Sequence, residues 1–148
     1  MEIIFSITPN LDRLAENLKD AGIGSQRAGM INLLTTVEAL AVKDAPKRTT
    51  NLARSRTSNV SADGSRGVLK FTAPYAAFVH EGTGLFGPHH QRIVPTNKRA
   101  LFWPGARHPV RSTAGMKGRP WVRQAANDVN VGAVYAEGMH NYLQQKGF

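Results

Sequence analysis

Apolar residues follow a helical period at both ends of this chain and an extended pattern in its middle. Between Gln26 and Asp44 they recur every three or four residues, which predicts a long amphipathic helix. The stripe consists of Met30, Leu33, Leu34, Val37, Leu40 and Ala41. Pro46 ends the helix, because the residue before a proline is pushed out of helical geometry.

Two further helices are predicted, one on each side. Thr8-Pro9 favours a helix start that runs past Leu18, because threonine can cap free amides and proline fits the first turn. Residues 1–8 alternate weakly and predict a short strand or an extended arm. Pro120 opens a last helix whose apolar stripe is rich in small residues, so this helix can pack close to a sheet or a neighbour. That stripe consists of Val122, Ala125, Ala126, Val129, Ala133 and Ala136.

The middle of the chain favours strands and loops. Residues 54–60 and 68–72, joined by a turn at 62–67, predict a β-hairpin. Residues 74–80 predict about one helical turn, and residues 82–95 predict a long loop that is functional or mobile.

Two more short strands are expected, at residues 99–103 and 107–112. Helices at the ends with strands bunched in the middle indicate an α+β fold. We therefore expect a single domain over residues 1–148. N-terminal helices precede a small central antiparallel sheet with a long loop, and the C-terminal helix packs on the sheet.

Charge adds a second asymmetry. The net charge is +9, and between Ala45 and Arg123 there are 14 Lys and Arg against only Asp63 and Glu81. The flanks together carry 5 basic and 8 acidic residues. A basic middle indicates a surface that meets a polyanion or an acidic neighbour, with a solvated cationic surface as the alternative.

Composition excludes several classes of chemistry. The chain has no cysteine, so it has no disulfide, thiolate zinc site or cysteine nucleophile, and a reducing cytosol is the simplest compartment. No run of about 18 apolar residues is present, so we expect no contact with a membrane. No pair of carboxylates, P-loop or dinucleotide motif is found, which predicts a chain that is not an enzyme; a small hydrolase ranks last for lack of a nucleophile and base.

The histidines are the remaining candidates for a metal site. His80, Glu81, His89, His90 and His108 could in principle gather around one ion. Adjacent histidines on an extended chain point to opposite sides and rarely share an ion. We therefore expect neither a metal nor another cofactor, and solvated or interface histidines instead.

The basic middle also carries aromatic residues. The cations are Arg92, Lys98, Arg99, Arg107, Arg111, Lys117, Arg119 and Arg123, and the aromatics are Phe86, Phe102, Trp103 and Trp121. Bases can stack on aromatic rings while cations hold phosphate. Because the predicted strands need a core, we expect most of these aromatics to be buried, and non-specific contact with DNA rather than sequence reading.

Four short motifs occur in a fixed order. Ala45-Pro46 closes the long helix, and Thr50 to Ser55 reads Thr-Asn-Leu-Ala-Arg-Ser. Tyr-Ala-Ala-Phe-Val-His-Glu-Gly-Thr-Gly begins at Tyr75, and Arg-Pro-Trp-Val-Arg-Gln-Ala begins at Arg119. Together they resemble the siphophage neck family of tail components typified by gene product ten of a lambda-like phage. The resemblance covers residues 30–127. Thr50 stands where that family usually has glycine, and Trp121 where it has phenylalanine.

The resemblance implies a structural subunit of the phage head–tail junction, made in the host cytoplasm and found in the virion neck. It implies a homo-oligomer, expected as a hexameric ring between the portal-side connector and the tail tube. Tail terminator is the favoured position, with a completion factor, connector-side stopper or minor capsid protein as alternatives. A non-specific nucleic-acid-binding protein is the alternative from another class.

Particular residues are expected to carry these contacts. Tyr75 and Phe78 are expected to place an aromatic pair in the core, and Glu81 to form an ion pair with an arginine of a neighbouring subunit, or to be a lone exposed carboxylate. The residues expected at subunit boundaries or at DNA in the channel are Glu81, Phe86, His89, His90, Arg92, Lys98, Arg99, Arg107 and Arg111.

Overall fold

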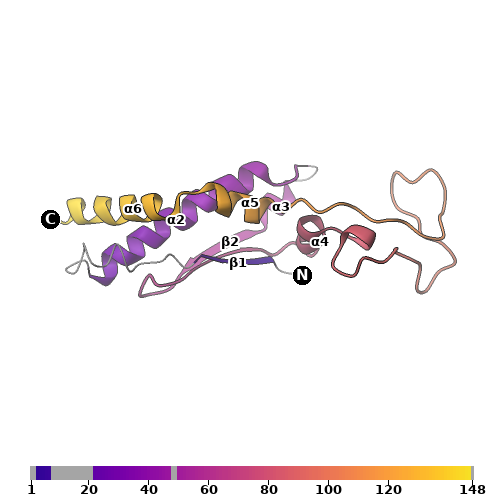
Figure 1. The fold of residues 1–148 in the computed structure, drawn as a ribbon, viewed down its shortest axis with the longest axis horizontal. Helices are drawn as coiled ribbons and strands as arrows, with labels where there is room; N and C mark the ends of the chain where they lie inside the picture. Colours follow the sequence, from indigo (N-terminus) through magenta and orange to yellow (C-terminus); the bar gives the residue numbers. More distant parts are fainter. Residues whose placement is uncertain (1–2, 8–21, 48–49, 148) are drawn as a thin grey trace. The chain divides into compact units, whose positions relative to one another are not determined.

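The computed structural model describes residues 3–7, 22–47 and 50–147. The chain divides into two compact units, which we describe separately. The helix–sheet unit lies within residues 2–73 and 121–148, and the loop unit is residues 74–120 (Figure 1). Helices combined with an antiparallel sheet confirm the α+β class. The single domain over residues 1–148 stays a prediction.

A three-stranded antiparallel sheet lies in the helix–sheet unit. Its strands are β1 (Ile3–Ile7), β2 (Arg56–Val60) and β3 (Gly67–Phe71), in the order β1-β3-β2. The expected strand near the N-terminus is therefore confirmed, and it pairs with the second strand of the predicted hairpin. In β3 alternate residues are buried, with Leu69 and Phe71 fully enclosed, because one face of this strand is covered by α2.

The long helix α2 (Ile23–Asp44) begins three residues before the predicted start and ends where predicted. Of its predicted stripe, five residues are buried and Leu40 is half-buried. A short helix, α3 (Asn51–Arg54), occupies the region where β2 was expected to begin. Thr50 has φ of −66°, which any residue adopts, so the missing glycine requires no unusual turn. The helix predicted from Thr8 lies outside the described residues.

The single C-terminal helix predicted from Pro120 is wrong. Two helices are present, α5 (Trp121–Asp128) and α6 (Val131–Gln145). Asn130 separates them because its side chain accepts a 3.1 Å hydrogen bond from the Ala133 amide and so caps α6. Because of this break, the buried face of α6 does not continue the predicted apolar stripe. Ala133 is exposed, whereas the buried residues of α6 are Tyr135, Gly138 and Met139.

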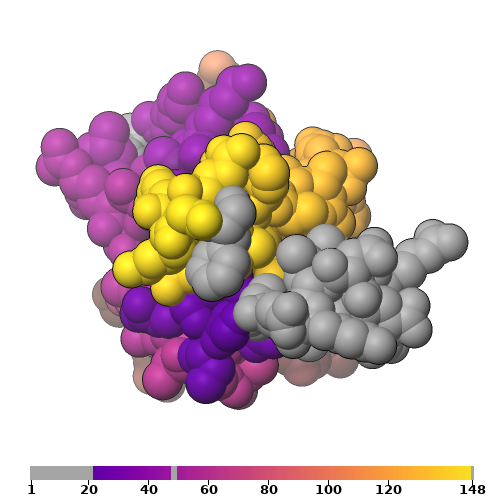
Figure 2. Space-filling view, turned by 90° about the vertical axis from the view of Figure 1, so that its left-hand side faces the viewer, coloured from indigo at the N-terminus to yellow at the C-terminus, as the bar shows by residue number. Residues whose placement is uncertain are grey.

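The two C-terminal helices lie mainly against α2 rather than on the sheet. Two glycines let α6 approach α2 closely: a Cβ added to Gly138 would come within 2.6 Å of Asn32 Cβ, and one added to Gly29 within 2.8 Å of Met139 Cγ. Figure 2 shows α6 (yellow) directly against the start of α2 (deep purple). The Tyr135 hydroxyl donates a 3.1 Å hydrogen bond to the Gln26 carbonyl, which fixes the crossing.

Trp121 joins α5 to the sheet. It is 1% exposed, and its ring meets Phe71 edge to face, with centroids 5.6 Å apart and planes at 83°. This tryptophan, which stands where the resembled family has phenylalanine, is fully accommodated. It forms the centre of the apolar core of the helix–sheet unit.

The loop unit contains little regular structure. It has one short helix, α4 (Ala76–Glu81), close to the predicted helical turn, and one 3-10 turn, η1 (Gly84–Phe86). The strands predicted at residues 99–103 and 107–112 are wrong, because this region pairs only at the isolated bridge between Leu101 and Val110.

Candidate functional site

The loop unit consists of an outgoing and a returning chain segment joined by backbone hydrogen bonds at separated points. Leu85 N donates to Ala114 O at 2.8 Å, and Ile93 N donates to Thr113 O at 2.9 Å. Between these two bonds the outgoing segment advances eight residues while the returning segment advances one. Residues 86–92 therefore bulge out between these two hydrogen bonds, and we call them the first excursion.

A second mismatch follows. Leu101 and Val110 exchange two backbone hydrogen bonds, of 2.8 and 3.0 Å. Residues 94–100 form the second excursion, because only two residues stand opposite them on the returning segment. Beyond the last pair lies an end loop, residues 102–109, whose Ala106 N donates to Trp103 O at 2.9 Å. The predicted loop at 82–95 is thus one part of a longer irregular region.

Glycines permit the crossing at the base of the loop unit. Gly82 and Gly84 have φ of +91° and +65°, values that disfavour side chains, and Gly115 opposite has +89°. A Cβ on Gly84 would overlap the Ala114 carbonyl oxygen. The His-Glu-Gly-Thr-Gly motif therefore carries its glycines for a backbone crossing. Its partner segment, which contains Gly115, was not singled out from the sequence, although its own glycines are the corresponding signal.

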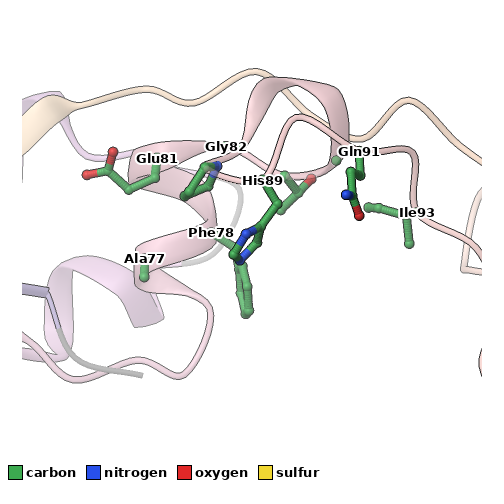
Figure 3. Close-up of a pocket in the computed structure, with 11 residues that line it drawn as sticks. Ala77, Phe78, Glu81, Gly82, His89, Gln91 and Ile93 are labelled. Atoms are coloured by element: carbon green, nitrogen blue, oxygen red, sulfur yellow. The ribbon is translucent and has the colours of Figure 1, made fainter.

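A pocket of ≈ 450 Å³ lies between α4, the glycine crossing and the first excursion (Figure 3). Its walls include Ala77, Phe78, Glu81, Pro88, His89 and Ile93. The predicted site residues Glu81 and His89 are thereby brought together, 8 positions apart in the chain. The walls formed by Ala77 and Ile93 were not predicted, because they depend on where the first excursion begins and ends.

One end of the pocket is charged and the remainder is largely apolar. In Figure 3 the rings of Phe78 and His89 lie on the same side of the ribbon, while the Glu81 carboxylate points away from them. Glu81 Oε1 lies 2.7 Å from His80 Nδ1, and the Glu81 side chain is 46% exposed. The Glu81 carboxylate is partly exposed but not alone, because it contacts His80. Its pairing with a neighbouring subunit stays a prediction.

The prediction that Tyr75 and Phe78 form a core pair is wrong. They are 38% and 48% exposed. The reason is that α4 has only six residues and buries a single face, formed by Ala76 and His80 four positions apart. Phe78 instead faces the pocket.

The prediction that most aromatics of the basic region are buried is also wrong. Phe86 is 43%, Phe102 67% and Trp103 45% exposed, and only Trp121 is enclosed. Phe102 and Trp103 follow the last backbone pair of the loop unit, where no second layer of structure covers them. Without the predicted strands there is no core for these rings to enter.

The other predicted contact residues are exposed, and they do not converge on one centre. The ring of Phe86, in the first excursion, has its centre 5.7 Å from Lys117 Nζ of the returning segment. His90 has a φ of +49°, and its Nδ1 lies 3.1 Å from the Leu85 carbonyl oxygen. Arg92 Nε donates a 3.0 Å hydrogen bond to Ser112 Oγ.

The remaining cations lie farther along the loop unit. Lys98 and Arg99 belong to the second excursion, Arg107 to the end loop and Arg111 to the returning segment. Residues 74–120 contain seven Lys and Arg in total, because Arg92, Lys117 and Arg119 add to these four. Glu81 is the one acidic residue in this range. The positive charge follows the irregular region rather than a single catalytic centre.

Among residues 3–7, 22–47 and 50–147, no three His, Asp or Glu side chains come together in a way that could hold a metal ion. His89 lines the pocket, whereas His90 turns back toward Leu85. No helix in the described part of the chain is long and apolar enough to cross a membrane.

Comparisons of the chain with protein-family models, curated proteins and solved structures find no match.

Proposed function

We propose that the chain is a structural subunit of the head–tail junction of a long-tailed bacteriophage, assembled as a ring through its loop unit. Tail terminator or tail-completion protein is the position favoured within the neck. The observation that carries the proposal is the exposure of the loop unit. None of residues 74–120, all of which the structure describes, buries a large apolar side chain.

The exposed side chains are numerous enough to require a partner. The loop unit exposes Tyr75, Phe78, Leu85, Phe86, Ile93, Val94, Phe102, Trp103 and Met116. Full burial of one large apolar side chain contributes about 1.5–3 kcal/mol, so covering several at an interface provides a strong driving force for association. Soluble monomers rarely leave this much apolar surface in one region uncovered.

The sequence resemblance supports the neck as the place of assembly. Two of the four motifs have clear structural roles: the His-Glu-Gly-Thr-Gly segment forms the glycine crossing and one wall of the pocket, and the Arg-Pro-Trp segment places Trp121 in the core. Neither role involves a reaction. The proposed mechanism is assembly, in which ring closure removes the apolar surface of the loop unit from water.

Two measurements test the proposal. Native mass spectrometry of the purified chain is expected to give a closed oligomer, with six copies as the expected number. Antibody detection in gradient-purified phage particles is expected to find the chain in the virion. A chain that stays monomeric at all concentrations and is absent from particles contradicts the proposed function.

Nucleic-acid binding is a second candidate, favoured by the exposed cations and by the exposed rings of Phe102 and Trp103. A stand-alone binder would hold free duplex DNA tightly, with an affinity that falls steeply as salt rises. Fluorescence anisotropy of a labelled duplex between low and physiological salt distinguishes the two candidates. Tight, salt-sensitive binding by a monomer favours nucleic-acid binding over the neck role.

A further inference from the structure

We propose that the end loop of one copy, residues 102–109, docks into the pocket beside α4 of the next copy. Copies of the chain would then join head to tail through two different surfaces of the loop unit. This inference rests on the proposed assembly function and specifies the contact that performs it. The occupant of the pocket is a second copy of this chain.

The end loop presents its aromatic residues on a hydrogen-bonded turn. Leu101 and Val110 close the loop with hydrogen bonds of 2.8 and 3.0 Å, and the turn from Trp103 to Ala106 is held by a bond of 2.9 Å. Phe102 is nevertheless 67% exposed and Trp103 45% exposed. Each hydrogen bond that already closes the loop reduces the conformational entropy lost on docking, and large exposed rings are suited to act as interface anchors.

The pocket offers a matching receptor. Its volume of ≈ 450 Å³ is within the range that holds a large organic group, and Ala77, Phe78, Pro88 and Ile93 give it apolar walls. Phe78 and Ile93 are themselves 48% and 36% exposed, so an incoming aromatic ring would cover them. Burial on both sides would then contribute to association.

The end loop and the pocket also differ in charge. Glu81, the one acid among residues 74–120, stands at the edge of the pocket. Arg99 and Arg107 flank Phe102 and Trp103 in the chain. Docking would bring two guanidinium groups toward a region with a carboxylate. An exposed ion pair adds little affinity, but it orients partners and speeds their encounter.

The end loop of one copy cannot occupy the pocket of the same copy. The pairs Ile93–Thr113 and Leu101–Val110 lie between the two features and hold them at different places in the loop unit. Figure 1 shows the irregular loops of this unit extending away from α4. Two distinct surfaces make a heterologous contact, which closes into a ring when the rotation between copies permits.

Mixing two full-length variants provides the test. The end-loop variant carries Phe102→Ser and Trp103→Ser, and the pocket variant carries Ala77→Trp, which fills the pocket. Ile23→Ser is the matched control, because Ile23 is 63% exposed but lies on α2. Mass is measured by light scattering after size exclusion and by native mass spectrometry, with circular dichroism as a check on folding.

Each variant alone is expected to associate roughly tenfold or more weakly than the wild type, since interface anchors dominate binding. Their mixture is expected to form a 1:1 dimer and nothing larger, because only one intact end loop and one intact pocket remain. The Ile23→Ser control is expected to assemble as the wild type does. A second pair, Glu81→Arg mixed with Arg99→Glu/Arg107→Glu, is expected to associate more tightly than either variant does alone.

The outcomes separate this inference from the proposed function. If either of the first two variants alone assembles like the wild type, or their mixture stays monomeric, docking of the end loop in the pocket is wrong while assembly through another surface stands. If the wild-type chain itself never assembles, the proposed function fails first and the docking fails with it.

Discussion

The two units of this chain use the same residue types in opposite ways. Trp121 in the helix–sheet unit is 1% exposed and contacts Phe71, whereas Trp103 in the loop unit is 45% exposed. Every large side chain of the apolar core belongs to the helix–sheet unit among the residues that the structure describes. One unit therefore contains the apolar core of the chain, and the other leaves its large apolar side chains exposed.

The backbone pairing of the two units also differs: it is continuous in the helix–sheet unit and interrupted in the loop unit. In the helix–sheet unit, β3 pairs with both neighbours over five consecutive residues. In the loop unit, pairing occurs at single bridges separated by excursions. Continuous ladders resist opening cooperatively, whereas isolated bonds open locally, so we expect the two units to respond differently to the same kind of mutation.

The largest expected contrast is between the two tryptophans. Trp121→Ala removes the centre of the core and is expected to lower the free energy of unfolding by about 3–5 kcal/mol. Trp103→Ala is expected to change it by no more than about 0.5 kcal/mol, as for other surface sites. Urea denaturation followed by circular dichroism, at one low protein concentration, measures both. Equal losses would contradict the division of roles.

A smaller effect is expected at the glycine crossing. Gly84→Ala places a side chain at φ of +65° against Ala114, which costs about 1–3 kcal/mol. The loss is expected to open the loop unit locally, so hydrogen exchange should accelerate at Leu85 while α2 stays protected. Gly132→Ala in α6 is the control, because a Cβ there meets only Asn130 Oδ1 at 3.8 Å. Unchanged exchange at Leu85 would show that the crossing is not strained by a side chain.

A third prediction concerns the helix–sheet unit, where Asn130 caps α6. Asn130→Ala removes the acceptor of the Ala133 amide and is expected to lower the free energy of unfolding by about 1 kcal/mol. Asn130→Asp keeps an acceptor and serves as the control. Chemical denaturation of the three chains measures the effect, and equal stability of all three would mean that the cap contributes nothing.

The smallest expected effect depends on pH. Hydrogen bonds from the Ser61 hydroxyl, then from the amide and hydroxyl of Ser65, lower the pKa of Asp63 from 3.8 to about 2. Because the folded pKa is lowered, the stabilisation is complete above about pH 4 and is lost as the pH falls toward 2. Thermal unfolding of the wild type and Asp63→Asn is expected to differ slightly above pH 4 and to converge near pH 2. A difference that persists at pH 2 contradicts this.

The helix–sheet unit was the more predictable of the two. The stripe of α2 and the hairpin from β2 to β3 follow from local periodicity and turn residues, and both are present. The break between α5 and α6 was missed because no proline or glycine marks it; Asn130 was the available signal. The close approach of Gly29 and Gly138 depends on tertiary packing, which no local pattern encodes.

The loop unit was less predictable for a physical reason. Apolar residues at 99–103 favour a strand only when a partner strand is in register, and here a single pair forms at Leu101. Pro109, which lacks an amide proton, stands within the second predicted strand, and Pro104 directly follows the first. The sequence predicted Glu81 and His89 as contact residues, and both line the pocket. The pocket itself arises from the uneven spacing of the backbone pairs, which the sequence did not reveal.

That uneven spacing has a consequence for how such a chain can vary. Each excursion begins and ends at a paired residue, so adding or removing residues within 86–92 or 94–100 leaves the pairing partners unchanged. Inserting one residue into β2, by contrast, would shift its register with β3 and move the side chains beyond the insertion to the opposite face of the sheet. The two excursions are therefore the places where new binding preferences can be introduced without rebuilding the fold.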